Sequence, residues 1–248
     1  MRAIFLGVLA LFSVVSGVAN ADTINIAYYS IPHAQGTQNS PNGDFGICCS
    51  SGPATLPNIS AGDLLGPNGL PVSSGGSFPV VSVDPITKEI QWWTGVPTLT
   101  TATALPFFNG NMYAPNGTGP NNSTVFQTAI LFGTVLGSGS DTILSVQGDD
   151  DVLVYLDGAY VGGTPGVHGS IPFSLNLGVL SAVPHDLKVF YADRAEVGAV
   201  FGIGLEGGTI NADPVPGPII GAGLPGLVMA LGGLVMLSRR RRNQGGVA

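Results

Sequence analysis

The sequence predicts an all-β fold, a single antiparallel β-sandwich with long loops, and three observations predict it. Gly and Pro are abundant, at 38 and 19 of 248 residues, which is typical of a chain with many turns. The middle of the chain is rich in Thr, Val, Asn and Ser, which favours short strands joined by turns. Several segments alternate apolar and polar residues with the period of two that a strand requires. The length suits one main domain.

The expected strands are short and are separated by turns of Pro, Gly and Asn. In chain order they span residues 23–29, 78–83, 90–93, 124–132, 141–146, 152–156, 173–177, 185–194 and 200–205. Trp92 and Trp93 are neighbours on one of them, so one indole can be buried while the other is exposed. A partly buried Trp is the commoner role, and stacking of an exposed indole on a sugar ring is the alternative. Residues 31–76 should form surface loops or several very short strands, and a tract that wraps the sandwich is a further alternative.

The charge distribution is strongly asymmetric. The net charge is −7, but five of the eight basic residues lie at the two ends, in Arg2 and in residues 239–242. Without these ends, Lys88, Lys188 and Arg194 face fifteen acids, a net charge of −12. Phosphate binding needs concentrated positive charge, so this composition excludes a nucleic-acid partner. It suits an exported protein that attracts cations.

The N-terminus has the pattern of a secretory signal peptide over residues 1–21. Arg2 precedes an apolar run at residues 4–15, and the small residues Ala19 and Ala21 stand at positions −3 and −1 of the expected cleavage site. A short membrane anchor is the alternative, although the apolar run is short for a membrane span. We expect cleavage after Ala21 and export across the inner membrane.

The rest of the chain divides by composition. Residues 22–104 should supply N-terminal strands and long loops, residues 105–210 the core of the sandwich, and residues 211–218 a Pro-rich linker. Residues 219–238 are apolar, and about 19 helical residues at about 1.5 Å each nearly cross a bilayer core, so one transmembrane helix is expected there. The basic tail, residues 239–248, should stay in the cytoplasm.

The stretch at residues 148–158 joins three consecutive carboxylates to a strand and a turn. Asp149, Asp150 and Asp151 would repel one another unless a cation compensates, and Ca²⁺ is the hard cation that oxygen ligands prefer. After them, residues 152–156 alternate between two faces, and Asp157 with Gly158 forms the two-residue turn that a hairpin favours. The three aspartates are therefore the expected metal ligands.

Other polar residues offer further candidates. His168 lies in a glycine-rich loop, where it either approaches the acidic residues as a ligand contact or is an ordinary surface residue; Asp157 is the second candidate ligand contact. Asp193 and Arg194 suggest a structural ion pair or loop clamp. Cys48 and Cys49 leave three states open: a strained vicinal disulfide, pairing with another chain, or free thiols.

Four segments, in this order, resemble the signatures of the fibro-slime domain. They are residues 106–108, 148–158, 167–169 and 190–194. That family is similar to the protective-antigen-type β-sandwich of flocculins and other surface lectins. In its lectin members, two successive Asp residues before a strand bind Ca²⁺, which coordinates sugar hydroxyls. The resemblance implies this role for Asp149 and Asp150, with Asp151 as a substitute in a register shifted by one.

The C-terminus resembles a PEP-CTERM sorting signal of bacteria. The signal combines a Pro-rich motif, an apolar span and a basic tail, and the motif here is Val215, Pro216, Gly217 and Pro218. The resemblance implies recognition by an exosortase-type membrane protease, loss of the span and delivery to the cell surface or matrix. A permanent membrane anchor is the alternative.

Together these features predict a non-enzymatic exported protein of the bacterial cell surface or extracellular matrix. Its partner would be an extracellular polysaccharide or surface glycan, bound with calcium. Two alternatives stay open: a structural matrix component that uses calcium only for stability, and a secreted hydrolase. The sequence contains neither the zinc-protease helix motif nor the glycine pattern of a nucleophile elbow.

Overall fold

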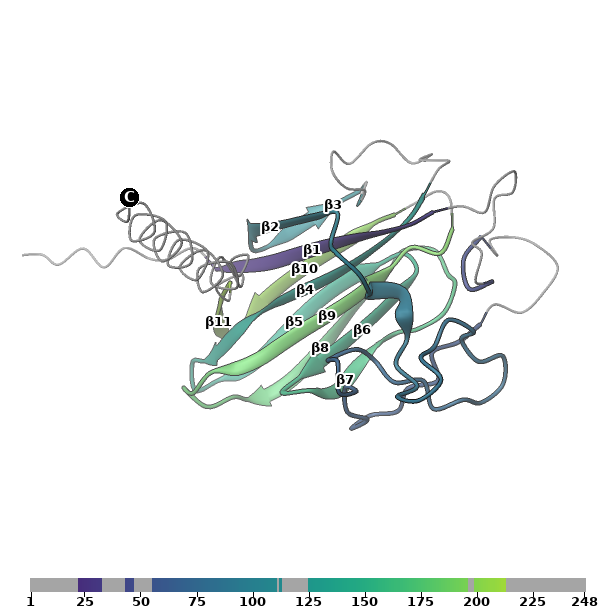
Figure 1. The fold of residues 1–248 in the computed structure, drawn as a ribbon. Helices are drawn as coiled ribbons and strands as arrows, with labels where there is room; N and C mark the ends of the chain where they lie inside the picture. Colours follow the sequence, from purple (N-terminus) through teal and green to yellow (C-terminus); the bar gives the residue numbers. More distant parts are fainter. Residues whose placement is uncertain are drawn as a thin grey trace, which may run out of the picture.

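The computed structural model describes residues 22–32, 43–46, 55–110, 112, 125–195 and 199–212 (Figure 1). Within these ranges it contains eleven strands and one short 3-10 helix, Gln91–Trp93. The strands are β1 Thr23–Pro32, β2 Leu99–Ala104, β3 Phe107–Asn109, β4 Val125–Gly137, β5 Asp141–Gly148, β6 Asp151–Leu156, β7 Ala159–Thr164, β8 Ile171–Val179, β9 His185–Ala192, β10 Phe201–Glu206 and β11 Gly208–Asn211. The fold is all-β, as the composition predicts.

The strands form two sheets. The larger has seven strands in the order β2-β1-β4-β9-β6-β7, with β11 also paired to β4, and the smaller has the order β3-β10-β5-β8. Every pairing between these strands is antiparallel. The chain passes from the small sheet to the large one between β5 and β6, which places the acidic residues at a crossing between the two sheets.

The main core lies between the two sheets. Val152 and Val154 of β6 point into it, together with Val146 of β5 and Phe201 and Ile203 of β10. These side chains are at most 3% exposed. Apolar residues alternate along β5, β6 and β10 because one face of each strand packs on the opposite sheet.

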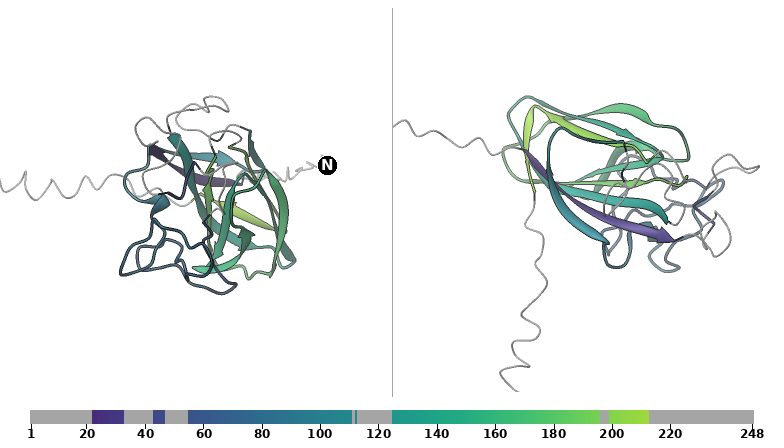
Figure 2. Two further views of the ribbon diagram at one scale, coloured as in Figure 1. Left: turned by 90° about the vertical axis from the view of Figure 1, so that its right-hand side faces the viewer. Right: turned by 90° about the horizontal axis from the view of Figure 1, so that it is seen from above.

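A second core covers the outer face of the seven-stranded sheet. Residues 43–46 and 55–98, here called the loop layer, lie beside β6 and β7, drawn in blue in Figures 1 and 2. Leu153 and Tyr155 of β6 point into this layer, where they join Phe45, Trp92 and Trp93 in one buried cluster. The expectation that the Pro- and Gly-rich tract wraps the sandwich is confirmed for its described residues, and β6 is buried on both faces.

Two strand predictions in the loop layer are wrong. Residues 78–83 form only isolated bridges, and residues 91–93 form the 3-10 helix. At about three residues per turn, neighbouring side chains of such a helix are separated by less than the half-turn of a strand. Trp92 and Trp93 are therefore both buried, at 1% and 2% exposure, and neither is free to stack on a sugar.

The other predicted strands all correspond to strands of the structure, although several are longer than expected. The sequence patterns did not predict four of the observed strands, β2, β3, β7 and β11. β2 is a run of Thr and Ala with one Leu, and β3 has three residues, so neither carries a strong alternating pattern. Asp157 and Gly158, at φ 50° and 79°, form the predicted turn between β6 and β7. Positive φ at both positions is the geometry of the favoured two-residue hairpin.

Several predictions fall outside the described residues. They concern the signal peptide at residues 1–21, Cys48 and Cys49, the sorting motif at residues 215–218, and the apolar span and basic tail at residues 219–248. Within the residues that the structure describes, no helix has the length and apolar character to cross a membrane.

Candidate functional site

The acidic loop, Gly148 to Asp151, connects β5 to β6 at one end of the sandwich. Gly148 is required there, because a Cβ atom would lie 2.1 Å from Cγ2 of Val152. The peptide between Asp149 and Asp150 is cis. The Asp149 N–H donates to the Val200 carbonyl oxygen at 3.0 Å, and the Asp150 N–H donates to that of Ala192 at 3.2 Å. The main chain of the loop is therefore held by the ends of β9 and β10.

Asp150 is held in a fixed orientation. It is 1% exposed, and each of its carboxylate oxygens accepts a main-chain N–H: Oδ1 from His168 at 2.8 Å and Oδ2 from Arg194 at 2.8 Å. A carboxylate oxygen has two lone-pair sites, so each oxygen keeps one for a further partner. The side chain is buried and oriented, yet it retains the capacity to bind a cation.

Asp149 lies against Asp150. It is partly exposed, its side chain interacts with that of Asp150 at hydrogen-bond range, and the Tyr191 hydroxyl donates to its carbonyl oxygen at 2.6 Å. Burial raises the pKa of both carboxyl groups, and it raises the pKa of Asp150 to about 6, with the neighbouring Asp149 charge adding to the effect. Two close carboxylates of raised pKa form a pair that a cation would stabilise.

Asp151 has a different partner. It is fully buried, and its Oδ2 lies 2.8 Å from Nε of Arg194, while its Oδ1 accepts the Gly166 N–H. Among the described residues neither Oδ2 nor Nε has a hydrogen-bond partner, so the contact between them is an ion pair without hydrogen-bond alignment. In the structure the charged partner of this carboxylate is the guanidinium of Arg194. Of the three predicted metal ligands, Asp151 is thus the one already held by a cationic side chain.

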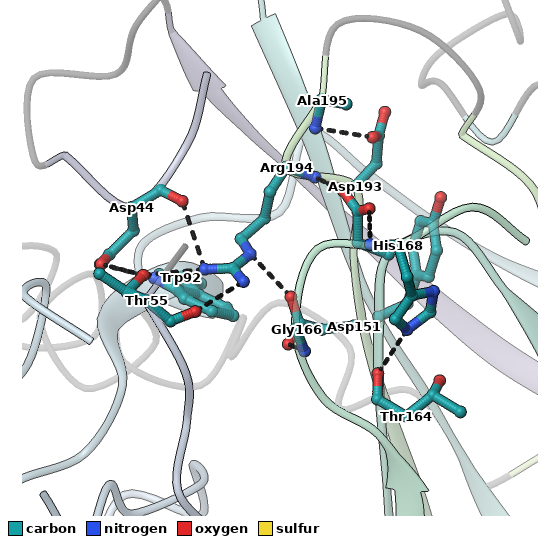
Figure 3. A network of polar contacts seen from close by, with 12 residues as sticks. Asp44, Thr55, Trp92, Asp151, Thr164, Gly166, His168, Asp193, Arg194 and Ala195 are labelled. Atoms are coloured by element: carbon teal, nitrogen blue, oxygen red, sulfur yellow. Dashed lines mark hydrogen bonds and ion pairs between the residues drawn. The ribbon is translucent and has the colours of Figure 1, made fainter. Parts of the chain in front are cut away.

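Arg194 connects the acidic loop to the loop layer (Figure 3). Its guanidinium donates to Oγ1 of Thr55 at 2.9 Å and to the Thr55 carbonyl oxygen at 2.8 Å, and it lies over the Trp92 ring at 5.0 Å from the centroid. The same residue orients Asp150 through its main-chain N–H. Arg194 is thus the loop clamp that the sequence suggested, but within the described residues its ion-pair partner is Asp151 and not the neighbouring Asp193.

The two predicted ligand contacts lie in different places. The His168 loop does reach the acidic loop, but through the main-chain N–H; the ring nitrogens lie 2.8 Å and 2.9 Å from the carbonyl oxygens of Gly169 and Thr164. Asp157 lies at the far end of β6, roughly 20 Å away at about 3.3 Å per residue. Its carboxylate accepts from His185 and from the Asp186 N–H. The structure does not bring Asp157 to the acidic loop.

The donor set at Asp149 and Asp150 consists of hard oxygens, which fits calcium. Within the described residues no three His, Cys, Asp or Glu side chains converge on one point. Since Ca²⁺ takes six to eight oxygens, the two carboxylates would supply only part of its shell, and carbonyl groups, amides or water would supply the rest. The ligand pair fits the metal but does not complete its coordination.

Sequence reasoning missed the partners that position the site. Arg194 contacts Thr55, 139 positions away in the chain, and the Asp44 carbonyl oxygen, 150 positions away. Neither contact follows a local pattern. The one signal was the scarcity of basic residues, which made it improbable that Arg194 would be left without an acidic partner.

No protein-family model matches the chain, and no curated protein matches it in sequence. Among solved structures, a PA14 sugar-binding domain from an RTX adhesin is similar, with 18% identity, 77% of this chain and 94% of that chain covered, and a TM-score of 0.36. The PA14 domain of the MpAFP antifreeze protein has 12% identity, coverages of 79% and 93%, and a TM-score of 0.35. The epithelial adhesin 9 A domain from Candida glabrata, in complex with Galb1-4GlcNAc, has 9% identity, coverages of 75% and 80%, and a TM-score of 0.35.

Proposed function

We propose that this chain is an exported bacterial surface or extracellular-matrix protein that binds polysaccharide or surface glycan through Ca²⁺ held by Asp149 and Asp150. One observation carries the proposal: the Asp150 carboxylate is buried, held by two main-chain N–H groups and placed against the carboxylate of Asp149. Such an arrangement is costly for folding alone, because burial disfavours the charged forms of both groups.

The charge balance of the corner supports a bound cation. Asp149, Asp150 and Asp151 stand near one guanidinium, that of Arg194, which is committed to Asp151. When both carboxyl groups are ionised, an excess of negative charge stays on the pair Asp149 and Asp150, offset in part by the charges of Arg194 and His168. In partly buried surroundings this excess is weakly screened and attracts a divalent ion.

In this proposal Asp149 and Asp150 bind the ion, and the N–H groups of His168 and Arg194 orient the Asp150 oxygens. The Arg194 guanidinium pairs with Asp151, so Asp151 is not one of the ion's ligands. A bound calcium ion would supply open coordination positions for vicinal sugar hydroxyls. The fibro-slime resemblance of the loop points to the same pairing of Asp149 with Asp150.

A glycan array probed with and without chelator tests the function. The exported protein should bind glycans in calcium and lose this binding in EDTA and in Asp150→Asn. Asp157→Asn is the matched control, because it changes one carboxylate at the far end of β6, and it should bind as the wild type does. Glycan binding that survives both EDTA and Asp150→Asn would exclude the calcium mechanism.

Thermal unfolding distinguishes glycan binding from the alternative in which calcium only stabilises the protein. Saturating calcium should stabilise the wild type by about 3 kcal/mol at about 100 times Kd, and should not stabilise Asp150→Asn. Stabilisation without any glycan binding would favour a matrix component that uses the ion only for its own stability. Release of reducing sugar from a bound glycan would favour the hydrolase.

We further propose that the chain is processed at both ends, as the signal peptide and the PEP-CTERM resemblance imply, with an exosortase-type protease as partner. Intact-mass measurement of the surface-associated protein tests this. The mature chain should begin after Ala21 and lack residues 239–242. Retention of those four arginines would favour a permanent membrane anchor.

A further inference from the structure

The outer face of the four-stranded sheet carries a groove of about 380 Å³. Leu144 and Val146 of β5 point into the core, as do Phe201 and Ile203 of β10, so Ser145, Gln147, Gly202 and Gly204 face outward. A volume of this size is within the range of ligand-binding clefts. The groove is separate from the acidic loop, whose residues do not line it.

Small residues form the floor of the groove. Gly204 pairs with Ser145, and Ser145 pairs with Ser174, so these three make one row across β10, β5 and β8. Pro106, the residue before β3, lies beside Gly204. With strands about 4.8 Å apart, the row from β3 to β8 is roughly 14 Å long. This length allows an extended ligand to lie across the strands.

The fold does not require a glycine at position 204. Its φ is not positive, and an added Cβ would make only ordinary contacts, at 3.7 Å from Pro106 and Ser145. Glycine inside a strand weakens it and often marks a place where a ligand or a second backbone approaches. Gly202 differs, because the Phe108 ring would lie 3.0 Å from its Cβ. The absence of a side chain at Gly204 thus leaves space in the groove.

Phe108 lies beside the groove, next to the lining residue Gly202. It pairs directly with Gly202 and is 64% exposed, which is unusual for so large an apolar side chain. The neighbouring row continues through Gly202 to Gln147 and Pro172. An aromatic ring therefore lies beside the groove, next to its lining residue Gly202, and the lining itself offers hydroxyl and amide groups.

We propose that this groove binds a segment of uncharged polysaccharide without a metal ion. None of its lining residues is charged, although the body of the chain carries −12, so the lining suits a neutral ligand. An aromatic ring with hydroxyl and amide neighbours matches the apolar faces and the hydroxyl rims of sugar rings. A peptide would instead use a free sheet edge or deep apolar pockets. The inference goes beyond the calcium site and does not depend on it.

Affinity electrophoresis in EDTA tests the proposal, with a soluble β-glucan, a galactomannan and the anionic alginate in separate gels. At least one neutral polysaccharide should retard the wild type, and alginate should not. Phe108→Ala should weaken the retardation about fivefold to tenfold. Gly204→Leu should abolish it by filling the groove, with an unchanged circular-dichroism spectrum. Phe78→Ala is the matched control, since Phe78 is 53% exposed in the loop layer.

Three results would overturn the proposal. One is the absence of retardation in both neutral gels. Another is equal retardation of Phe108→Ala and the wild type. The third is retardation that appears only in calcium and is lost in Asp150→Asn, which would assign the binding to the acidic loop. Conversely, retardation in EDTA that Asp150→Asn retains would support the groove even if the calcium site fails its own test.

Discussion

Nε of Arg194 lies 2.8 Å from Oδ2 of Asp151, and both side chains are completely buried. The main-chain N–H of Arg194 also donates to Asp150, and its guanidinium donates to Thr55 in the loop layer. One residue therefore joins the outer loop layer, the end of β6 and the oriented carboxylate of the candidate calcium site.

Replacing Arg194 with Met should destabilise the protein by about 3–5 kcal/mol, because Asp151 would be left buried without a counter-charge. Urea unfolding followed by Trp fluorescence measures the change. Lys88→Met is the control, since Lys88 lies on the surface, and it should stay within about 0.5 kcal/mol of the wild type. A loss below about 1 kcal/mol for Arg194→Met would mean that water or another cation compensates Asp151.

Asp150 should make stability fall as pH rises. Its folded pKa is raised to about 6 by burial, above the value of 3.8 for an unperturbed Asp, so the folded chain holds the extra proton between these values. Measured in EDTA, the stability of the wild type relative to Asp150→Asn should fall by up to about 3 kcal/mol from pH 4 to pH 7. The exposed Asp141→Asn should keep the wild-type slope. A difference that grows with pH would contradict the assignment.

Asp44 should control the order of the loop layer. Its carboxylate accepts the N–H groups of Val81 and Ser82 at 2.9 Å and 2.8 Å, and Nε1 of Trp92 at 3.0 Å. Asp44→Ala should cost about 1–3 kcal/mol, because the Trp92 donor is buried. Hydrogen exchange at Val81 and Ser82 should accelerate, while β6 stays protected. Asp84→Ala is the control, because this loop carboxylate accepts the N–H groups of Ile86 and Thr87 instead, and it should leave the Val81 and Ser82 amides unchanged. Equal exchange in the two variants would refute the role of Asp44.

The turn at Asp157 offers a test of backbone conformation. Its φ of 50° is tolerated by Asn but disfavoured for a β-branched residue. Asp157→Asn should change stability by about 0.5 kcal/mol or less, since the Asp157 side chain in its ion pair with His185 is 54% exposed. Asp157→Val should cost about 1–2 kcal/mol more. Thermal unfolding of both variants checks the ranking, and equal stabilities would contradict the turn geometry.

Local pattern was sufficient for much of the fold. The alternation at residues 152–156 predicted which side chains of β6 face the two cores, because a strand turns neighbouring side chains to opposite faces whatever packs on them. The turn at Asp157 and Gly158 followed from the same kind of reasoning, since few residues tolerate positive φ. These features depend on a few consecutive residues, and so they can be read along the chain.

Contacts between residues far apart in the chain determine the arrangement of the candidate site and the burial of the tryptophans. The sequence by itself determined an all-β chain with an acidic loop before a strand. Only the tertiary structure decided that Arg194 takes Asp151, that Asp149 and Asp150 remain as a pair, and that both tryptophans are buried. The groove beside Phe108 likewise exists only because β3, β10, β5 and β8 lie in this order. Charge pairing and burial depend on which segments meet in space, and no local pattern encodes that.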